Sequence, residues 1–287
     1  MEWLTQCSLC ESKQIETLCL ENHFSRCREC GLIFDNPRPE WTEITAFYAK
    51  ETQYDEWLSE KKARDDLWKR RLRLVRKYIP QGKLLDVGSG IGQFLFHAKK
   101  YFQVTGTEIS PVAVKIAREN YGVVLLQGTL ESVPLESQYD VITLFHVLEH
   151  VPLPKKTLQE CLKRLKPGGI LVLAVPNDVD SVLTRRNRLM ERRGFEKYKS
   201  LGKLGLPKLT LNGSEIHLSH FTAPVLSLKL NQLGFEIVDT ALDPYFAVSG
   251  IRKVRRYLRF GIYSCLNWLL GKNLYDTIWI VAKKKIE

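Results

Sequence analysis

Short apolar runs alternate with helical segments through the middle of the chain, and this alternation restricts the possible folds more than any other feature. Helical patterns at 94–101, 111–120 and 155–165 separate the runs. The runs that we expect to be strands lie at 83–87, 104–109, 123–127, 139–145 and 170–175. Strands joined by such helices pair in parallel, and the helices cover both faces of the sheet. The sequence therefore predicts the α/β class, with an open sheet of Rossmann-like type.

A glycine-rich loop follows the first predicted strand, which is where sheets of this type bind ligands. It reads Gly88-Ser89-Gly90-Ile91-Gly92, and Gln93 stands where the third glycine of a dinucleotide fingerprint, G-x-G-x-x-G, would be. Glu108 ends the second strand, where a carboxylate can accept hydrogen bonds from two ribose hydroxyls. The combination favours an adenosine-bearing cofactor. NAD is the alternative, although this loop is less suited to a pyrophosphate.

Four stretches follow one another over 83–177: LLDVGSGIGQF, VTGTEIS, YDVITLFHVLEHVP and LKPGGILVLAVPN. In this order and spacing they resemble the motifs of class I S-adenosylmethionine-dependent methyltransferases. The resemblance resumes at 217–239 and 276–284, which look like the last helix and the sixth and seventh strands of that fold. It implies a seven-stranded sheet with helices on both faces, S-adenosylmethionine as cofactor, and methyl transfer as the activity.

The resemblance also assigns roles to cofactor-binding residues. Asp86 would anchor the loop or the cofactor ammonium, and Glu108 would hold the ribose hydroxyls. Many relatives have an aspartate after the third strand, whereas this chain has Gly128-Thr129-Leu130, so adenine would contact Thr129 or backbone groups. Phe145 would border the sulfonium, or else be an ordinary buried aromatic at a strand end. The residues expected at the cofactor are Asp86, Gly88, Ser89, Gly90, Gly92, Glu108, Thr129, Leu130 and Phe145.

Four of the seven cysteines form two pairs near the N-terminus, Cys7-x2-Cys10 and Cys27-x2-Cys30. Two residues between thiolates let a tight turn aim both sulfur atoms at one ion, and four thiolates complete a tetrahedral zinc site. Because four cysteines leave no open position, we expect this zinc to be structural. Four unrelated cysteines or a redox pair are the alternatives. His23 could replace one cysteine ligand.

These features divide the chain into two parts. We expect residues 1–50 to form a zinc-binding ribbon and connector, and 51–287 to form the methyltransferase domain. The ribbon followed by GLIFDNPRP is similar to a bacterial subgroup with a zinc-ribbon preface, whose members act in natural-product, deoxysugar and cell-surface polysaccharide pathways.

Histidines are the candidates for a catalytic base. Methyl displacement from a sulfonium requires no metal, but an oxygen acceptor benefits from a base whose pKa lies near the working pH. The candidates in predicted active-site segments are His146, His150, His217 and His220. Packing or loop-holding roles are the alternative for each. The fragment HVLEH is not the HExxH of zinc proteases, because its Glu is misplaced.

The positive charge of the chain, +11 at pH 7, is concentrated in two segments. Residues 181–210 carry nine basic and two acidic residues, and 251–260 carry five basic and no acidic ones. Both belong to insertions, at about 178–215 and 244–273, on the side where acceptors enter this fold. The charge therefore favours an anionic acceptor that is phosphorylated, nucleotide-linked or lipid-linked.

The segment 251–270 combines its cations with apolar residues at helical spacing and with Trp268 near its end. Such a helix lies in an anionic membrane interface or packs over the active site as a lid. No charge-free run of about 18 apolar residues and no secretory signal are visible. We therefore expect a cytoplasmic protein, peripheral at the inner face of the membrane if this helix binds lipid.

Two functions follow from the sequence. The favoured one is methyl transfer to a small-molecule, sugar or polysaccharide, or lipid-linked anionic acceptor in a biosynthetic pathway. The alternative is an RNA methyltransferase whose ribbon and basic insertions bind RNA. Two observations disfavour RNA: residues 7–30 hold three basic and four acidic residues, and aromatic residues for base stacking are sparse in 181–210.

Overall fold

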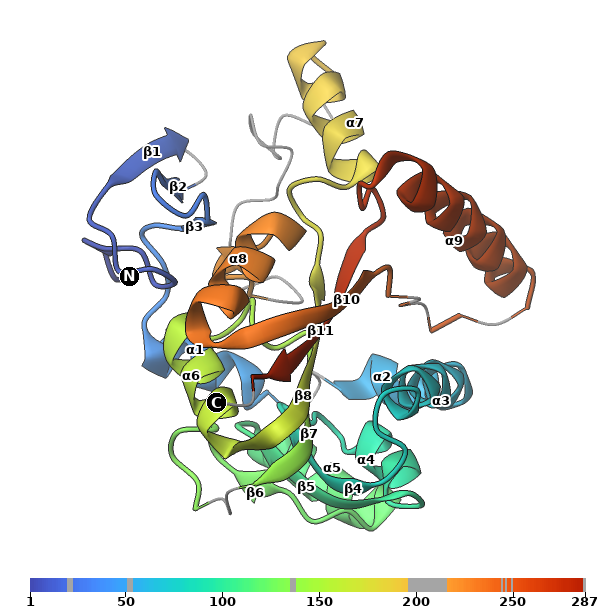
Figure 1. Ribbon diagram of the computed structural model, residues 1–287. Coiled ribbons are helices and arrows are strands. Elements are labelled where there is room, and N and C mark those ends of the chain that lie inside the picture. Colours follow the sequence, from blue (N-terminus) through green and yellow to red (C-terminus); the bar gives the residue numbers. More distant parts are fainter. Residues whose placement is uncertain are drawn as a thin grey trace.

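A seven-stranded sheet forms the centre of the computed structural model, which describes residues 1–19, 23–50, 54–134, 138–195, 216–243, 245, 247–248 and 250–285. Its strands lie in the order β10-β11-β8-β7-β4-β5-β6 (Figure 1). Their bounds are β4 Gly82–Val87, β5 Phe102–Glu108, β6 Leu126–Gln127, β7 Tyr139–Phe145, β8 Leu165–Pro176, β10 Phe235–Ala241 and β11 Thr277–Lys284. Strands β4 to β8 pair in parallel, and β11 is antiparallel to both of its neighbours. The predicted fold class is confirmed.

Helices cover both faces of this sheet, and the strands therefore read as continuous apolar runs. Along β8, Val172 and Ala174 face one core cluster, whereas Leu171 and Leu173 face the other. The first cluster is completed by α3 Lys61–Arg76, α4 Gln93–Ala98 and α5 Pro111–Tyr121. The second is completed by α6 Pro154–Arg164 and α8 Ala223–Leu233.

Two predicted elements differ from those observed. The sequence predicts one helix from Asp55 to residue 79, but the chain forms α2 Asp55–Ser59 and α3, with a break at Glu60. The break lets Trp57 of α2 lie against the glycine-rich loop. The third strand is predicted over 123–127 and is reduced to β6, which is an edge strand paired only with β5.

A second, smaller sheet holds the N-terminal part. It contains β1 Ile15–Cys19, β2 Phe24–Cys27 and β3 Ile33–Asp35, all antiparallel. Its fourth strand is β9 Ser219–His220, which pairs with β3. The helix α1 Trp41–Tyr48 follows, with a capping box between Glu40 and Glu43. A strand from far along the chain therefore joins the ribbon sheet to the larger part.

The two predicted basic insertions contain helices that Figure 1 shows at one end of the molecule. These are α7 Val182–Arg192 and α9 Gly250–Leu270. Residues 196–215, which hold the rest of the first basic insertion, lie outside the described residues. In the part of the chain that is described, no helix is both long enough and apolar enough to cross a membrane.

Candidate active site

The glycine-rich loop presents bare backbone beside β4. Gly88 and Gly90 adopt φ values of +65° and +53°, a region that favours glycine. A Cβ atom at Gly88 would lie 2.5 Å from Val147, and one at Gly90 would lie 2.8 Å from the ring of Trp57. The loop thus packs closely against Val147 and Trp57, which leaves no room for a side chain at either glycine.

Glu108 ties this loop to the next strand. Its carboxylate is buried and accepts hydrogen bonds from the backbone N–H of Gly90 at 2.7 Å and of Ser110 at 2.9 Å. Burial raises the pKa of Glu108, and these backbone donors oppose the rise. The carboxylate therefore stands at the end of β5, as predicted, and fixes the loop in place.

Asp86 is buried at the end of β4. It accepts a hydrogen bond from the hydroxyl of Thr143 at 2.6 Å, and burial raises its pKa to about 7. The Ser89 hydroxyl donates to the Asp86 carbonyl at 2.9 Å. Thr143 thus fixes the Asp86 carboxylate, and Ser89 ties the loop to the end of β4.

A pocket of about 620 Å³ opens over these residues, which is a size that suits a small organic ligand. Eight of the nine predicted cofactor residues line it: Asp86, Gly88, Ser89, Gly90, Glu108, Thr129, Leu130 and Phe145. Gly92 is not in the lining. It starts α4 with φ +75°, and a Cβ atom there would lie 3.0 Å from Ala117. In the part of the chain that is described, Gly92 lies where α4 contacts α5.

The other walls of the pocket come from residues that the sequence reasoning missed. Five of them lie on α2, on α3 or just before α2: Tyr54, Trp57, Arg64, Trp68 and Arg71. Arg38, Trp41 and Tyr48 come from the N-terminal part, and Tyr245 from the segment after β10. Only the aromatic and basic spacing along 57–71 hinted at the first group. No local pattern marks the others.

Arg71 is the most deeply buried cation of this wall. Its guanidinium pairs with Asp243, which is also fully buried, and donates to Nε2 of His146 at 2.9 Å. It also lies 4.7 Å from the ring centre of Phe145. Phe145 in turn stacks on Trp279, at 5.6 Å between ring centres. Phe145 is thus both a buried strand-end aromatic and part of the pocket lining.

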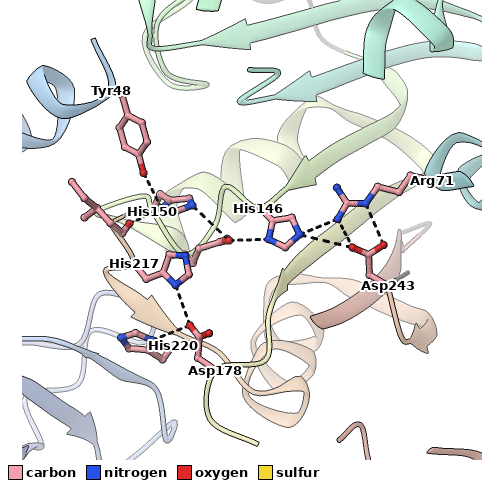
Figure 2. Close-up of polar contacts among 10 residues, drawn as sticks. Tyr48, Arg71, His146, His150, Asp178, His217, His220 and Asp243 are labelled. Atoms are coloured by element: carbon pink, nitrogen blue, oxygen red, sulfur yellow. Dashed lines mark hydrogen bonds and ion pairs between the residues drawn. The ribbon is translucent and has the colours of Figure 1, made fainter. Parts of the chain in front are cut away.

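His146 and His150 lie in the loop after β7 and line the pocket (Figure 2). Nδ1 of His146 lies 3.4 Å from the Glu149 carboxylate, and Nε2 of His150 lies 3.7 Å from it. Nδ1 of His150 contacts the Ile216 carbonyl at 2.5 Å and the Tyr48 hydroxyl at 3.0 Å. The predicted proximity of the two histidines is therefore observed.

The same cluster sets the charge of its members. Burial lowers the pKa of His146, but contacts with Asp243 and Glu149 outweigh it, so the pKa is raised overall. Burial raises the pKa of Glu149, but His150 and His146 hold it below its ordinary value. Glu149 is therefore a carboxylate at neutral pH, and it favours protonation of its histidine neighbours.

His217 and His220 lie behind this pair and are not in the described pocket lining. The ring of His217 packs 5.0 Å from that of His150, and its Nδ1 contacts Asp178 at 3.2 Å. His220 is buried between Asp178 and Asp35, each at 3.1 Å. Nε2 of His220 contacts Asp35 of β3, and Nδ1 contacts Asp178 in the segment after β8. His220 therefore links β9 to both.

The four N-terminal cysteines converge as predicted. Cys7 and Cys30 place their sulfur atoms 3.6 Å apart, and Cys10 and Cys27 place theirs 3.4 Å apart. All four lie within 4.8 Å of one another, close to the separation of about 3.8 Å that tetrahedral zinc–thiolate bonds require. The backbone N–H groups of Leu9 and Cys30 point at Cys7 and Cys27 sulfur atoms. The donor set fits a metal ion.

Comparisons with known proteins agree with this geometry. Residues 54–240 match the family described as a methyltransferase domain. An uncharacterised protein of Methanocaldococcus jannaschii is 32% identical over 137 residues, which are 47% of this chain and 62% of that protein. The ubiquinone biosynthesis O-methyltransferase of Idiomarina loihiensis is 33% identical over 105 residues, 33% of this chain and 42% of the enzyme. The chain thus spans less than two thirds of these relatives.

Solved structures with low identity share the fold. A Thermotoga maritima methyltransferase described as a possible histamine N-methyltransferase has a TM-score of 0.53 and 21% identity, over 86% of this chain and all of that one. Magnesium protoporphyrin IX methyltransferase of Synechocystis, solved with bound S-adenosylhomocysteine, has a TM-score of 0.53 and 14% identity, over 85% and 99%. Because the family match covers more than half of the chain, the chain belongs to the class I S-adenosylmethionine-dependent methyltransferases.

Proposed function

We propose that this chain transfers the methyl group of S-adenosylmethionine to an anionic small-molecule, sugar or lipid-linked acceptor in a biosynthetic pathway. One observation carries the proposal: a single pocket is lined both by the bare loop with Glu108 and by His146 and His150. The relatives named for ubiquinone biosynthesis are O-methyltransferases, which supports an oxygen of a small molecule as the acceptor atom.

The residues fit the cofactor at the glycine-rich loop, where Gly88, Ser89 and Gly90 line the pocket with little side chain to keep a ligand from the backbone. When bound, S-adenosylmethionine supplies an electrophilic methyl group on its sulfonium. In this proposal Asp86, Ser89 and Glu108 hold the loop that receives it, with Thr129 and Leu130 at the adenine. Holding two reactants in line can supply about 7–11 kcal/mol of the barrier.

His146 is our choice for proton acceptance. An acceptor hydroxyl loses its proton as its oxygen bonds to the methyl carbon, and His146 receives that proton between Glu149 and Asp243. Arg71 and Asp243 orient His146, and Tyr48 and the Ile216 carbonyl orient His150. His217 and His220 stand behind the pair, where they position it.

The four-cysteine cluster is proposed to hold a structural zinc ion. Its sulfur atoms are placed for one tetrahedral ion, and β3 of the same sheet leads directly to Arg38, Trp41 and Tyr48 in the pocket wall. The ion would therefore stabilise one wall of the acceptor site and take no part in the chemistry.

Helix α9 is proposed to contact an anionic membrane surface, with the protein at the inner face of the membrane. Two of its cations hold it to the protein: Lys253 pairs with Asp66 at 2.6 Å, and Arg259 with Asp276 at 2.9 Å. Its apolar residues point outward, with Leu258 65% and Trp268 83% exposed. An apolar face turned to solvent supports an interfacial helix over a lid.

Calorimetry with S-adenosylmethionine and S-adenosylhomocysteine tests the proposed cofactor. We expect both to bind, and we expect Glu108→Ala to weaken binding by ten- to a hundredfold, since charge-assisted hydrogen bonds contribute about 1.5–3 kcal/mol. Glu119→Ala, an exposed acid on α5, is the matched control. No binding by the unaltered chain would refute the assignment.

A labelled methyl-transfer assay against separated extracts then identifies the acceptor class. We expect label in the nucleotide-sugar, polar small-molecule or lipid-linked fractions. Label confined to RNA would favour the alternative function, in which the basic segments bind nucleic acid.

A further inference from the structure

The Glu149 carboxylate is buried without the partners that such a group normally needs. Its side chain is 1% exposed, and neither oxygen accepts a hydrogen bond from any residue that the structure describes. Two histidine nitrogens, His146 Nδ1 at 3.4 Å and His150 Nε2 at 3.7 Å, lie at ion-pair distances from it. Buried carboxylates are costly unless they are hydrogen-bonded, paired or bound to a metal.

Two histidines beside this carboxylate, His150 and His217, are oriented by contacts at their Nδ1 atoms. Nδ1 of His150 faces the Ile216 carbonyl, which can only accept, so Nδ1 donates and Nε2 carries the lone pair. Nδ1 of His217 faces the carboxylate of Asp178, so its Nε2 carries the lone pair in the same way. Metal-binding histidines are held by this kind of contact, with Nδ1–H donated to a carbonyl or carboxylate.

We propose that Glu149, His150 and His217 bind a divalent transition-metal ion, with Zn²⁺ preferred. Each offers one ligand atom, and the three atoms lie within 4.8 Å of one another. Figure 2 shows the rings of His150 and His217 side by side. Two imidazoles and one carboxylate form the ligand set of many catalytic zinc sites, which keep a fourth position open. His150 lines the pocket, so the open position adjoins the acceptor space.

A neighbouring group, Asp178 with His217 and His220, has similar spacing but a different chemistry. Asp178 already receives both histidines at 3.1–3.2 Å, and His220 is held at its other nitrogen by Asp35. These groups satisfy one another, whereas Glu149 does not have hydrogen-bond partners among the described residues. We therefore assign the metal ion to Glu149, His150 and His217, and Asp178 orients His217.

The role of this ion rests on the proposed function. A metal ion polarises an oxygen ligand and favours loss of its proton. In the transfer, the acceptor O–H bond breaks and the proton passes to His146. The oxygen then bonds to the methyl carbon, and the electron pair of the S–CH3 bond stays on sulfur.

Zinc content of the full-length chain tests the site. Wild type, Glu149→Gln, His217→Gln and the control His97→Gln are dialysed to equilibrium at one buffered Zn²⁺ concentration and analysed for zinc per chain. His97 contacts Asp65 on the far side of the cofactor loop, so its variant should match wild type. We expect Glu149→Gln and His217→Gln to hold one ion fewer than wild type, with the cysteine-bound ion retained.

Equal zinc in wild type and in both variants overturns the proposal and leaves Glu149 paired with a protonated histidine. Circular dichroism checks folding, and if one variant does not fold, the other decides. Calorimetry with S-adenosylhomocysteine on the same samples separates the two hypotheses. Cofactor binding without the extra zinc refutes only the metal site, whereas the extra zinc without cofactor binding refutes the proposed function.

Discussion

Arg71 is a fully buried cation that organises three groups of the site at once. It pairs with Asp243, orients His146 and lies over Phe145. Removal of one member of a buried ion pair leaves the other charged group without compensation, which costs about 3–5 kcal/mol. The integrity of the pocket wall therefore depends on this single guanidinium.

Arg71→Met should lower the free energy of unfolding by about 3–5 kcal/mol. The matched control is Lys253→Met, which breaks the partly exposed pair with Asp66 and should cost below about 1 kcal/mol. Urea denaturation followed by circular dichroism measures both. Similar losses in the two variants would contradict the assigned importance of Arg71.

His220 gives the protein a dependence on alkaline pH. Burial lowers its pKa, but hydrogen bonds with Asp178 and Asp35 outweigh this effect and raise the pKa to about 9. The folded chain therefore holds this proton more tightly than the unfolded chain does. The resulting stability is complete below about pH 6.5 and is lost as the pH rises through about 9.

The free energy of unfolding should thus fall by about 3 kcal/mol between pH 6.5 and 9.5 through this residue. His220→Gln should be less stable at pH 6.5 and should lose most of this slope. Urea denaturation at several pH values gives the comparison. A variant with the wild-type slope would show that another group is responsible.

Local motifs predicted which residues come together at the glycine-rich loop, because the loop, Asp86 and Glu108 lie within 23 residues of one another. The residues that complete the pocket could not be predicted in this way. Arg71 meets Asp243 across 172 positions of sequence, and Tyr48 meets His150 across 102. No local pattern showed that Asp178 contacts His217 or that the Ile216 carbonyl contacts His150.

At the scale of elements, α9 differs from an ordinary amphipathic helix in its orientation. Basic residues on one side bind it to acids near α3 and β11, while its apolar residues point outward. The sequence predicted the helix and its two faces. It could not predict which face would be turned toward the protein, because that depends on Asp66 and Asp276.

Vesicles with anionic phospholipid should retain the protein, and neutral vesicles should not. Arg255→Ala with Arg256→Ala should reduce retention by about tenfold or more, since each basic residue contributes about 1 kcal/mol at an anionic surface. Arg73→Ala with Arg118→Ala removes the same charge from exposed positions on other helices. Sedimentation with vesicles measures all three. Equal loss in both double variants would show a general charge effect and not an interface at α9.

At the scale of the whole molecule, the two sheets are not independent. Strand β9 pairs with β3, His220 meets Asp35, and Arg38 donates to the Pro152 carbonyl at 2.8 Å. The predicted boundary near residue 50 separates two sequence patterns, and these contacts cross it, as does that of Tyr48 with His150. Sequence patterns mark where elements change type, but they do not report such distant pairing.

A fragment of residues 51–287 should therefore unfold at a lower temperature than the full chain and should bind acceptor poorly. It lacks the partner strand of β9 and the pocket residues Arg38, Trp41 and Tyr48. Thermal unfolding followed by circular dichroism gives the comparison. A fragment as stable as the full chain would show that the ribbon is a separable module.

The shared wall of the pocket has a consequence for inheritance and for protein engineering. Residues that line the pocket come from the N-terminal part as well as from the larger sheet, and β9 joins the two. A change of acceptor preference during evolution would thus require matched changes in segments that are far apart in the gene. An engineer who grafts a new specificity onto this scaffold should move residues 1–50 and 216–222 as one cassette.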